Sequence, residues 1–194
     1  MSVVIINYNA GNVQSVTYAL NRLGVDPVLS DDPEVIRSAD KVIFPGVGEA
    51  STAMNFLRQK GLDQVIKTLN QPVFGVCLGL QLMCKHSAEN DTECLGIFDI
   101  EVKKFEPKLK VPQMGWNTLE QVSGPLFEGL GKDPYVYFVH SYYAELSDYT
   151  TAVTDYVNPF SAALQKDNFY ALQAHPEKSG KVGESILENF LQLS

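Results

Sequence analysis

Apolar and polar residues are patterned differently in the two halves of this chain. In the first half, short apolar runs typical of buried strands alternate with stretches in which apolar residues recur at helical spacing. The predicted strands cover residues 3–8, 26–30, 41–46 and 72–77. The predicted helices cover residues 12–24, 32–39, 49–61 and 78–87, with one more helical stretch before residue 72. Strands separated by helices of about a dozen residues predict a parallel, doubly wound sheet with helices on both faces.

Capping residues mark two of the helix boundaries. Gly24 closes the first helical stretch, and glycine is typical of a helix C-terminus. Asp32 and Pro33 open the second stretch, because an aspartate side chain caps free N–H groups and proline fits the first turn. These signals support the helix limits independently of the apolar pattern.

The second half is mostly strand-like. Its predicted strands cover residues 96–105, 113–122, 135–146, 150–157, 160–166 and 168–175. A final helix is predicted over 181–193, and no internal repeat or flexible linker interrupts the chain. We therefore expect residues 1–194 to form a single α/β domain. Its sheet is flavodoxin-like, doubly wound and mostly parallel, with an added antiparallel region in the C-terminal half.

Composition narrows the class of protein. The net charge of -8 over 194 residues argues against nucleic-acid binding, which needs a basic surface. No apolar run reaches the roughly 18 residues that a membrane span requires, and the first residues lack the features of a signal peptide. Three cysteines form an odd and sparse set, which fits a reducing cytosol better than a disulfide framework, so we expect a cytoplasmic protein.

The segment Gly75-Val76-Cys77-Leu78-Gly79 lies between a predicted strand and a predicted helix. It has the form of a nucleophile elbow, in which two glycines let the chain turn sharply around a strained central residue. The helix N-terminus favours a thiolate at Cys77, and the Leu78 N–H would point towards an oxyanion beside the sulfur. A small cysteine filling space at a strand end is the competing interpretation, and this segment alone leaves both open.

A thiol nucleophile needs a base, and His175 is the best of three histidines. In His175-Pro176-Glu177, extended backbone would turn the histidine and the glutamate to the same side, so that the carboxylate orients the imidazole. His86 lies nine residues past Cys77 on the same predicted helix, too far to reach the sulfur. His140 ends a strand and could pack or line a pocket.

The turn Pro45-Gly46-Val47-Gly48 follows a predicted strand and precedes a helix. Taken alone it is an ordinary strand-to-helix turn, and it matches neither a phosphate-binding loop nor a dinucleotide fingerprint. Its glycines would also free a backbone N–H to face negative charge on a carbonyl oxygen. In a parallel sheet it would lie at the same edge as the elbow, where such folds bind ligands.

A group of Cys84, His86 and Cys94 could at first be taken for a metal site. It offers only three ligands, and their spacing is that of no familiar zinc site. We therefore expect no metal and no other cofactor.

Together these residues resemble the class-I (triad) glutamine amidotransferases, and the likeness covers essentially the whole chain. The blocks that carry it read NYNAGNVQSV, FPGVGEA, GVCLGLQLM, VPQMGWN, YFVHSYY and QAHPEKS. The elbow and the His-Pro-Glu segment point to the class. The NAGN, GWN and YFVHSY blocks resemble those of the glutaminase subunits of imidazole glycerol phosphate synthase, which serve histidine biosynthesis.

The resemblance implies a mechanism. Cys77 attacks the side-chain amide of glutamine, and His175, oriented by Glu177, moves the proton as ammonia leaves. The resulting glutamyl thioester is then hydrolysed to glutamate. The oxyanion is held by the Leu78 N–H and by an N–H of the turn, at Val47 or Gly48. In the family the second donor is thought to need a backbone rearrangement that accompanies partner and substrate binding.

The resemblance also assigns substrate and partner contacts. Gly46, Gln81, Ser141 and Tyr142 match positions that hold glutamine. Ammonia passes to a (β/α)8 cyclase subunit, which makes imidazole glycerol phosphate and AICAR, in a heterodimer. The residues matching the partner-facing positions are Asn12, Met114, Trp116, Tyr137 and Lys178. For Trp116 and Tyr137, ordinary core or rim packing is the alternative.

Three residues depart from the family pattern. Asn7 stands where aspartate is usual, Gln113 where histidine is usual, and Ala174 where phenylalanine is usual. None of them removes a group that the mechanism needs. Ala174 could loosen packing beside His175, and Gln113 puts the details of the partner interface in doubt.

Other functions remain compatible with parts of the sequence. A paralogue could feed ammonia to a different synthase, for example in the amidination of a surface sugar. The glutaminase of pyridoxal phosphate synthesis lacks the GWN block. A cysteine-elbow peptidase, chaperone or redox sensor would not need Gln81, the His-Pro-Glu segment and the YFVHSY block together. A non-catalytic binding subunit would be free to lose Cys77, His175 or Glu177.

Overall fold

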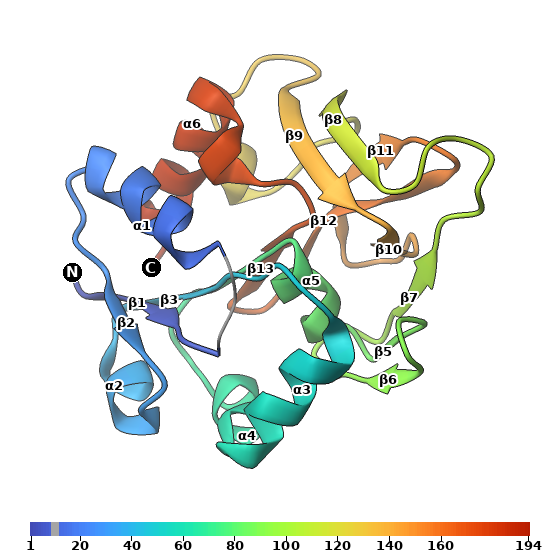
Figure 1. The fold of residues 1–194 in the computed structure, drawn as a ribbon. Helices are drawn as coiled ribbons and strands as arrows, with labels where there is room; N and C mark the ends of the chain where they lie inside the picture. Colours follow the sequence, from blue (N-terminus) through green and yellow to red (C-terminus); the bar gives the residue numbers. More distant parts are fainter. Residues whose placement is uncertain (9–11) are drawn as a thin grey trace.

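A computed structural model describes residues 1–8 and 12–194 of the chain (Figure 1). The NAGN block lies partly outside the described residues. The helices are α1 (Val13–Arg22), α2 (Pro33–Ser38), α3 (Ala50–Gln59), α4 (Leu62–Lys67), α5 (Leu78–Met83) and α6 (Gly180–Gln192), with 3-10 turns η1 (Pro125–Phe127) and η2 (Pro176–Lys178). The strands of the first half are β1 (Val3–Ile6), β2 (Val28–Ser30), β3 (Lys41–Phe44), β4 (Val73–Val76), β5 (His86–Ser87) and β6 (Thr92–Glu93). Those of the second half are β7 (Glu101–Lys104), β8 (Gln113–Thr118), β9 (Tyr135–His140), β10 (Tyr142–Ala144), β11 (Thr150–Asp155), β12 (Pro159–Lys166) and β13 (Phe169–Leu172).

The main sheet has eleven strands in the order β2-β1-β3-β4-β13-β12-β10-β7-β5-β6, with β11 paired to β12. The five strands from β2 to β13 run parallel, and the pairs that join β13 to β12, β10 and β7 are antiparallel. This confirms the predicted doubly wound, mostly parallel sheet with an added antiparallel region. Strands β8 and β9 form a separate two-stranded ribbon.

Two layers of apolar side chains cover the two faces of the sheet. Along β1, Val4 and Ile6 pack with helices α2 to α5, whereas Val3 and Ile5 pack with α1, α6 and β9. This division follows from the alternation of side chains along a strand. Figure 1 shows the same arrangement, with α1 and α6 on one side of the sheet and α2, α3 and α4 on the other.

The caps predicted from the sequence are present. The Asp32 side chain accepts a hydrogen bond from the Glu34 N–H at 2.8 Å, and Pro33 begins α2. Gly24 follows α1 with a φ of 77°, a left-handed conformation that glycine adopts without strain.

The predicted helix 78–87 is wrong in its second half. Helix α5 ends at Met83, and Cys84 has extended backbone. The chain then forms β5, which pairs with β6 and β7. These pairings supply the backbone hydrogen bonds that a longer helix would have made, and two-residue strands carry no periodic signal in the sequence.

The predicted strand 135–146 is two strands separated at Ser141. Strand β9 pairs with β8 in the separate ribbon, and β10 joins the main sheet between β12 and β7. The chain therefore changes sheet at this residue. Strand 96–105 is also shorter than predicted, because only residues 101–104 pair with neighbours.

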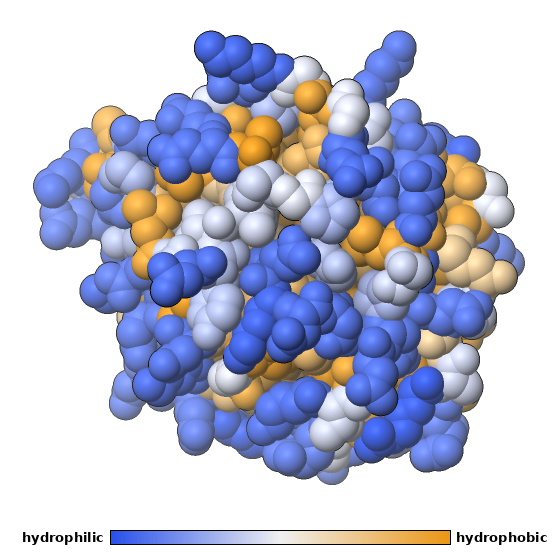
Figure 2. Space-filling view, turned by 180° about the vertical axis from the view of Figure 1, so that it is seen from behind, coloured by the Kyte–Doolittle hydropathy of each residue, from blue (hydrophilic) through white to orange (hydrophobic). Residues whose placement is uncertain are grey.

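The face opposite to the view of Figure 1 is mostly hydrophilic, with apolar side chains scattered over it in small groups (Figure 2). Among the described residues, no helix has both the length and the apolar character needed to cross a membrane.

Candidate active site

Cys77 stands at the sharp turn between β4 and α5. Its φ of 54° and ψ of -107° lie outside the regions that side chains ordinarily allow, so the backbone is strained there. The glycines on both sides are required by packing. A Cβ on Gly79 would collide with the Phe44 carbonyl, and one on Gly75 would lie 2.9 Å from the Met83 sulfur. The strand, turn and helix therefore have the geometry of a nucleophile elbow.

His175 and Glu177 lie just beyond β13, the strand next to β4. The Nδ1 atom of His175 is 2.8 Å from Oε1 of Glu177. The expected contact is present, but the backbone reason given for it is wrong. Pro176 to Lys178 form a 3-10 turn instead of extended chain, and this turn brings the glutamate back beneath the imidazole. Asn12 donates to the same Oε1 atom at 3.0 Å.

The histidine and the glutamate are both buried, and each charge depends on the other. Burial opposes the charged imidazole, but the Cys77 sulfur and the Glu177 carboxylate raise the pKa of His175 to about 10. Burial likewise acts to raise the pKa of Glu177, and the hydrogen bond and charge of His175 lower it overall. The imidazole is therefore positively charged at neutral pH, beside the sulfur.

The turn at Pro45–Gly48 follows β3 and lies against the start of α5. The Leu78 N–H, predicted to face an oxyanion, donates to the Gly46 carbonyl oxygen at 3.3 Å. A side chain at Gly46 would collide with the Tyr8 hydroxyl, so the turn needs glycine there. In this conformation the Leu78 N–H, next to the nucleophile, already donates to the Gly46 carbonyl and is not free to donate to an oxyanion.

A cavity of about 320 Å³ opens above Cys77. It is lined by Val47, Gly48, Cys77, Leu78, Gln81, Glu89, Pro112, Val139, His140, Ser141, Tyr142, His175 and Lys178. It thus brings together the elbow, the base, the turn and three of the four predicted glutamine contacts. Gly46, the fourth, lies behind it against Leu78.

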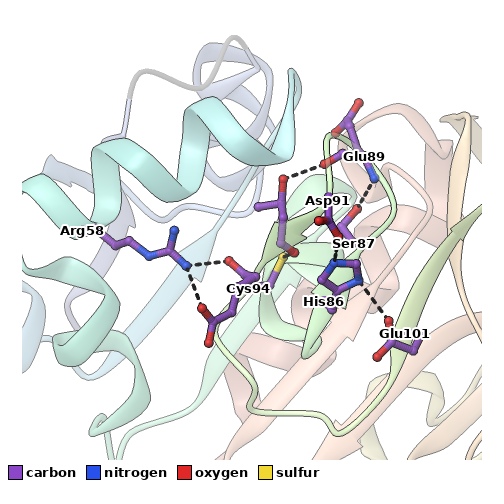
Figure 3. Close-up of polar contacts among 9 residues, drawn as sticks. Arg58, His86, Ser87, Glu89, Asp91, Cys94 and Glu101 are labelled. Atoms are coloured by element: carbon purple, nitrogen blue, oxygen red, sulfur yellow. Dashed lines mark hydrogen bonds and ion pairs between the residues drawn. The ribbon is translucent and has the colours of Figure 1, made fainter.

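Glu89 is a cavity residue that the sequence analysis missed. It lies in the turn between β5 and β6 (Figure 3). Its carboxylate accepts a hydrogen bond from the Ala50 N–H at the start of α3, at 2.7 Å. Burial raises its pKa. Residues 88–91 read as an ordinary polar turn, and only the pairing of β5 with β7 brings that turn to the cavity.

His86 does not lie on α5 as predicted but in β5. Its Nδ1 atom is 3.0 Å from Glu101 and its Nε2 atom is 2.8 Å from Asp91, so the ring bridges two carboxylates (Figure 3). The hydrogen bond to Asp91 leads the causes that raise the pKa of His86. The histidine thereby ties the turn that carries Glu89 to β7. Cys84 and Cys94 are both buried, and burial raises the pKa of each thiol.

No group of three or more metal-ligating side chains occurs among residues 1–8 and 12–194. Cys84, His86 and Cys94, which the sequence analysis considered and set aside as a metal site, form no such group in this part of the chain. Cys94 faces the Thr92 carbonyl at 3.5 Å and Cys84 faces the Leu80 carbonyl at 3.4 Å. Their thiols contact backbone rather than the histidine.

The residues assigned to the partner fall into two groups. Met114 and Trp116 are about half exposed on β8, and the Trp116 ring stacks on Tyr135 and meets Tyr137 edge-on. Asn12 is buried against Glu177, and Lys178 lines the cavity. Trp116 is therefore not a core residue, whereas Asn12 and Lys178 lie close to the candidate catalytic residues.

The three departures from the family pattern have different surroundings. The Gln113 side chain is buried, with its amide 2.9 Å from Nε2 of His140. Ala174 is completely buried beside His175. The Asn7 backbone N–H donates to the Ser30 carbonyl at 2.9 Å.

Comparison with known proteins agrees with this geometry. A family model described as Glutamine amidotransferase class-I matches residues 4–193. A Bacteroides thetaiotaomicron protein named Imidazole glycerol phosphate synthase subunit HisH is 60% identical, and the match covers 100% of both chains. A Vibrio parahaemolyticus protein of the same name is 46% identical over 98% of both chains.

A solved structure supports the fold alone. It is described as "Crystal structure of glutamine amidotransferase", has a TM-score of 0.78 with 20% sequence identity, and the match covers 98% of each chain. The full-length matches in sequence carry the assignment further. This chain belongs to the class-I glutamine amidotransferases and, within them, to the family of HisH subunits of imidazole glycerol phosphate synthase.

Proposed function

We propose that this chain is the glutaminase subunit of imidazole glycerol phosphate synthase, a cytoplasmic enzyme of histidine biosynthesis. Residues 1–194 act as one amidotransferase domain that hydrolyses glutamine to glutamate and ammonia. The ammonia passes to a (β/α)8 cyclase subunit, which makes imidazole glycerol phosphate and AICAR. One observation carries the proposal: Cys77 at a strained elbow shares a cavity with a charged His175 that is hydrogen-bonded to Glu177.

Catalysis begins with the sulfur of Cys77. The positive charge of His175 beside it favours the thiolate, which is the nucleophilic form of cysteine. The thiolate attacks the amide carbon of glutamine and forms a tetrahedral oxyanion. His175 then protonates the amide nitrogen, the C–N bond breaks, and ammonia leaves a glutamyl thioester on the sulfur.

Hydrolysis of the thioester uses the same groups in reverse. His175, now neutral, takes a proton from water, and the hydroxide adds to the thioester carbon. Breaking the C–S bond releases glutamate and restores the Cys77 thiolate with the imidazolium. Glu177 keeps Nδ1 of His175 directed towards itself, so that Nε2 faces the reacting atoms throughout.

The oxyanion requires donors that the resting conformation does not offer. The Leu78 N–H is bonded to the Gly46 carbonyl, so the turn must rearrange before the Leu78 and Val47 or Gly48 N–H groups can face the substrate oxygen. We infer that the partner and its nucleotide substrate promote this change. Without them, glutamine hydrolysis stays slow and ammonia is not wasted.

Charge and hydrogen bonding orient the amino-acid end of glutamine. Glu89 supplies a carboxylate to the cavity, which suits the α-ammonium group. Gln81, Ser141 and Tyr142 line the same cavity and supply an amide, a hydroxyl and backbone groups for the rest of the substrate. The exposed Met114 and Trp116 on β8 give the cyclase an apolar surface beside the cavity.

The proposal is tested by assembling the chain with the cyclase and its nucleotide substrate. Glutamine hydrolysis is expected to be slow in the isolated chain and to rise when both are added. The Cys77→Ala variant should abolish glutamine-dependent product formation while the complex still uses free ammonia. Glutamine use by that variant would reject Cys77 as nucleophile. Product formation with a different synthase only would reject the acceptor, as in amidination of a surface sugar.

A further inference from the structure

Gln173 is a completely buried glutamine two residues before His175. It does not line the cavity but lies behind it, between the nucleophile and a cavity residue. Its Nε2 atom is 3.6 Å from the Cys77 sulfur, and its Oε1 atom is 3.0 Å from Nε2 of Gln81. It therefore contacts the reacting sulfur without lining the cavity.

The orientation of the Gln173 amide is fixed by its neighbours. The backbone carbonyl of Tyr142 can only accept hydrogen bonds, and Nε2 of Gln81 donates to it at 2.9 Å. The second hydrogen on that nitrogen donates to Gln173, so the Gln173 oxygen must face Gln81. The Gln173 NH2 group then faces the sulfur, and turning its amide round would place two NH2 groups against each other.

The same carbonyl fixes the histidine beside this network. Nδ1 of His140 is 2.7 Å from the Tyr142 oxygen and must donate to it. Burial lowers the pKa of His140 to about 4, so the ring is neutral and its Nε2 atom accepts. The Gln113 side-chain amide lies 2.9 Å from that atom through its Oε1 atom, and it donates to the neutral ring when the amide is turned with its NH2 group towards Nε2. The contacts therefore form a continuous network from Gln113 through His140, the Tyr142 carbonyl, Gln81 and Gln173 to the sulfur.

The groups around the Cys77 sulfur interact differently with its thiol and its thiolate. The Val139 carbonyl, 3.7 Å away, accepts a hydrogen bond from the thiol and offers nothing to the thiolate. The Gln173 NH2 group donates, so it interacts best with the thiolate. The other titratable groups facing the sulfur are His175, which Glu177 supports from behind, and Tyr8, which is buried and interacts with Cys77 electrostatically.

We propose that Gln173 is a further catalytic residue, whose buried amide donates to the Cys77 thiolate and ties the nucleophile to Gln81. The donor does not line the cavity, so it stabilises the thiolate without occupying the space of the substrate. The hydrogen bond to Gln81 fixes the position of this substrate-binding side chain relative to the Cys77 sulfur. This second part rests on the proposed glutamine hydrolysis, whereas the effect on the sulfur does not.

The test compares the reactivity of Cys77 in the full chain with and without the donor. Gln173→Met keeps a similar side-chain volume and removes both hydrogen-bonding atoms. We expect the rate constant for modification of Cys77 by iodoacetamide at neutral pH to fall about 10-fold, as for loss of a buried hydrogen bond to a charged group. Peptide mass mapping separates Cys77 from Cys84 and Cys94. Gln165→Met on strand β12 is the matched control and should react like the wild type.

Kinetics in the complex separate this effect from general loosening. Gln173→Met should lower kcat about 10-fold with little change in KM, whereas Gln81→Met should act mainly on KM. Folded Gln173→Met protein with a wild-type alkylation rate would overturn the proposal, even if glutamine hydrolysis fell. If the complex hydrolyses no glutamine at all, the proposed function fails while the alkylation result still decides the role of Gln173.

If Gln173→Met does not fold, an NMR measurement that keeps Gln173 in place tests the same hydrogen bond. The side-chain amide of Gln173, labelled with nitrogen-15, should shift when Cys77 is replaced by alanine, because its acceptor is lost. The amide of Gln165 should not shift. An unchanged Gln173 resonance would overturn the proposed hydrogen bond.

Discussion

Replacing Glu177 by glutamine removes the charge that faces the His175 imidazolium while keeping the shape of the side chain. The glutamate is fully buried, 2.8 Å from Nδ1 of His175 and 3.0 Å from Nδ2 of Asn12. A buried charge that loses its partner is destabilising. We therefore expect Glu177→Gln to unfold more readily and its imidazole to give up its proton more easily.

The pKa of His175 sets the size of the effect. Burial opposes the charge, yet the Cys77 sulfur and Glu177 together raise the pKa from 6.5 to about 10. A difference of this size corresponds to roughly 5 kcal/mol of stability at most. The sulfur contributes more than the carboxylate. Loss of a buried hydrogen bond to a charged group costs about 2 kcal/mol, so we expect Glu177→Gln to lower the melting temperature of a chain this long by about 4–8 °C.

The sign of the pH dependence follows from the two pKa shifts. Because the folded pKa of His175 lies above 6.5, its contribution is complete below that pH and is lost as the pH rises towards about 10. The pKa of Glu177 is lowered from 4.5, so its contribution is present above pH 4.5 and is lost as the pH falls through the folded value. The stability difference between wild type and variant should be largest between these limits and should narrow towards pH 10.

Urea unfolding followed by far-UV circular dichroism measures this difference at about pH 5.5 and about pH 9.5. Dichroism is preferable to fluorescence because the single tryptophan, Trp116, is already half exposed in the folded chain. Glu184→Gln is the control, since its pair with Arg22 is on the surface and should matter by less than about 1 kcal/mol. A difference for Glu177→Gln that stays constant or widens with pH would refute the reasoning.

Three further substitutions test other parts of the structure. Gly79→Ala should destabilise the chain by at least about 2 kcal/mol in urea unfolding, because its Cβ would meet the Phe44 carbonyl, whereas Gly131→Ala has open space and should change little. Glu89→Gln should raise KM for glutamine about 10-fold in steady-state assays of the complex, with kcat nearly unchanged, because the α-ammonium group of glutamine loses its carboxylate partner. A fall in kcat as large as the rise in KM would contradict this role of Glu89. His86→Gln should lower the free energy of unfolding by less than about 1 kcal/mol, and only at low pH. Because the pKa of His86 is raised in the folded chain, the stabilisation by its ion pairs is complete below pH 6.5 and is lost above the folded pKa. A loss of stability that persists at high pH would contradict the ion pairs of His86 with Asp91 and Glu101.

The fold could be predicted where the periodic signal was long. The parallel strands β1, β3 and β4 are apolar on both faces, and the helices between them carry apolar stripes and caps that the sequence states directly. The short pairings could not be predicted. β5 and β6 have two residues each and arise because residues far along the chain, on β7, complete their hydrogen bonds.

Some residues of the candidate site could likewise be predicted from the sequence, and others could not. Cys77, His175 and Glu177 were predictable because each belongs to a contiguous motif whose residue types have few other uses together. Glu89 and Gln173 were not, since a glutamate in a polar turn and a glutamine at a strand end are common. Their places depend on the pairing of β5 with β7 and on the network around the Tyr142 carbonyl.

In this structure the candidate nucleophile and its base already lie together, whereas the proposed oxyanion donor is bonded within the Pro45–Gly48 turn. The charged His175, held by Glu177, which Asn12 supports in turn, already stands beside the sulfur, so these groups need no rearrangement to come together. The Leu78 N–H, by contrast, is bonded to the Gly46 carbonyl, so the donor that we propose for the oxyanion is not free in this conformation. One missing donor of this kind costs about 100-fold or more in rate, so movement of a single turn would be enough to switch hydrolysis. We therefore propose that control over glutamine use lies in the backbone of the Pro45–Gly48 turn, while the triad stays assembled in both states.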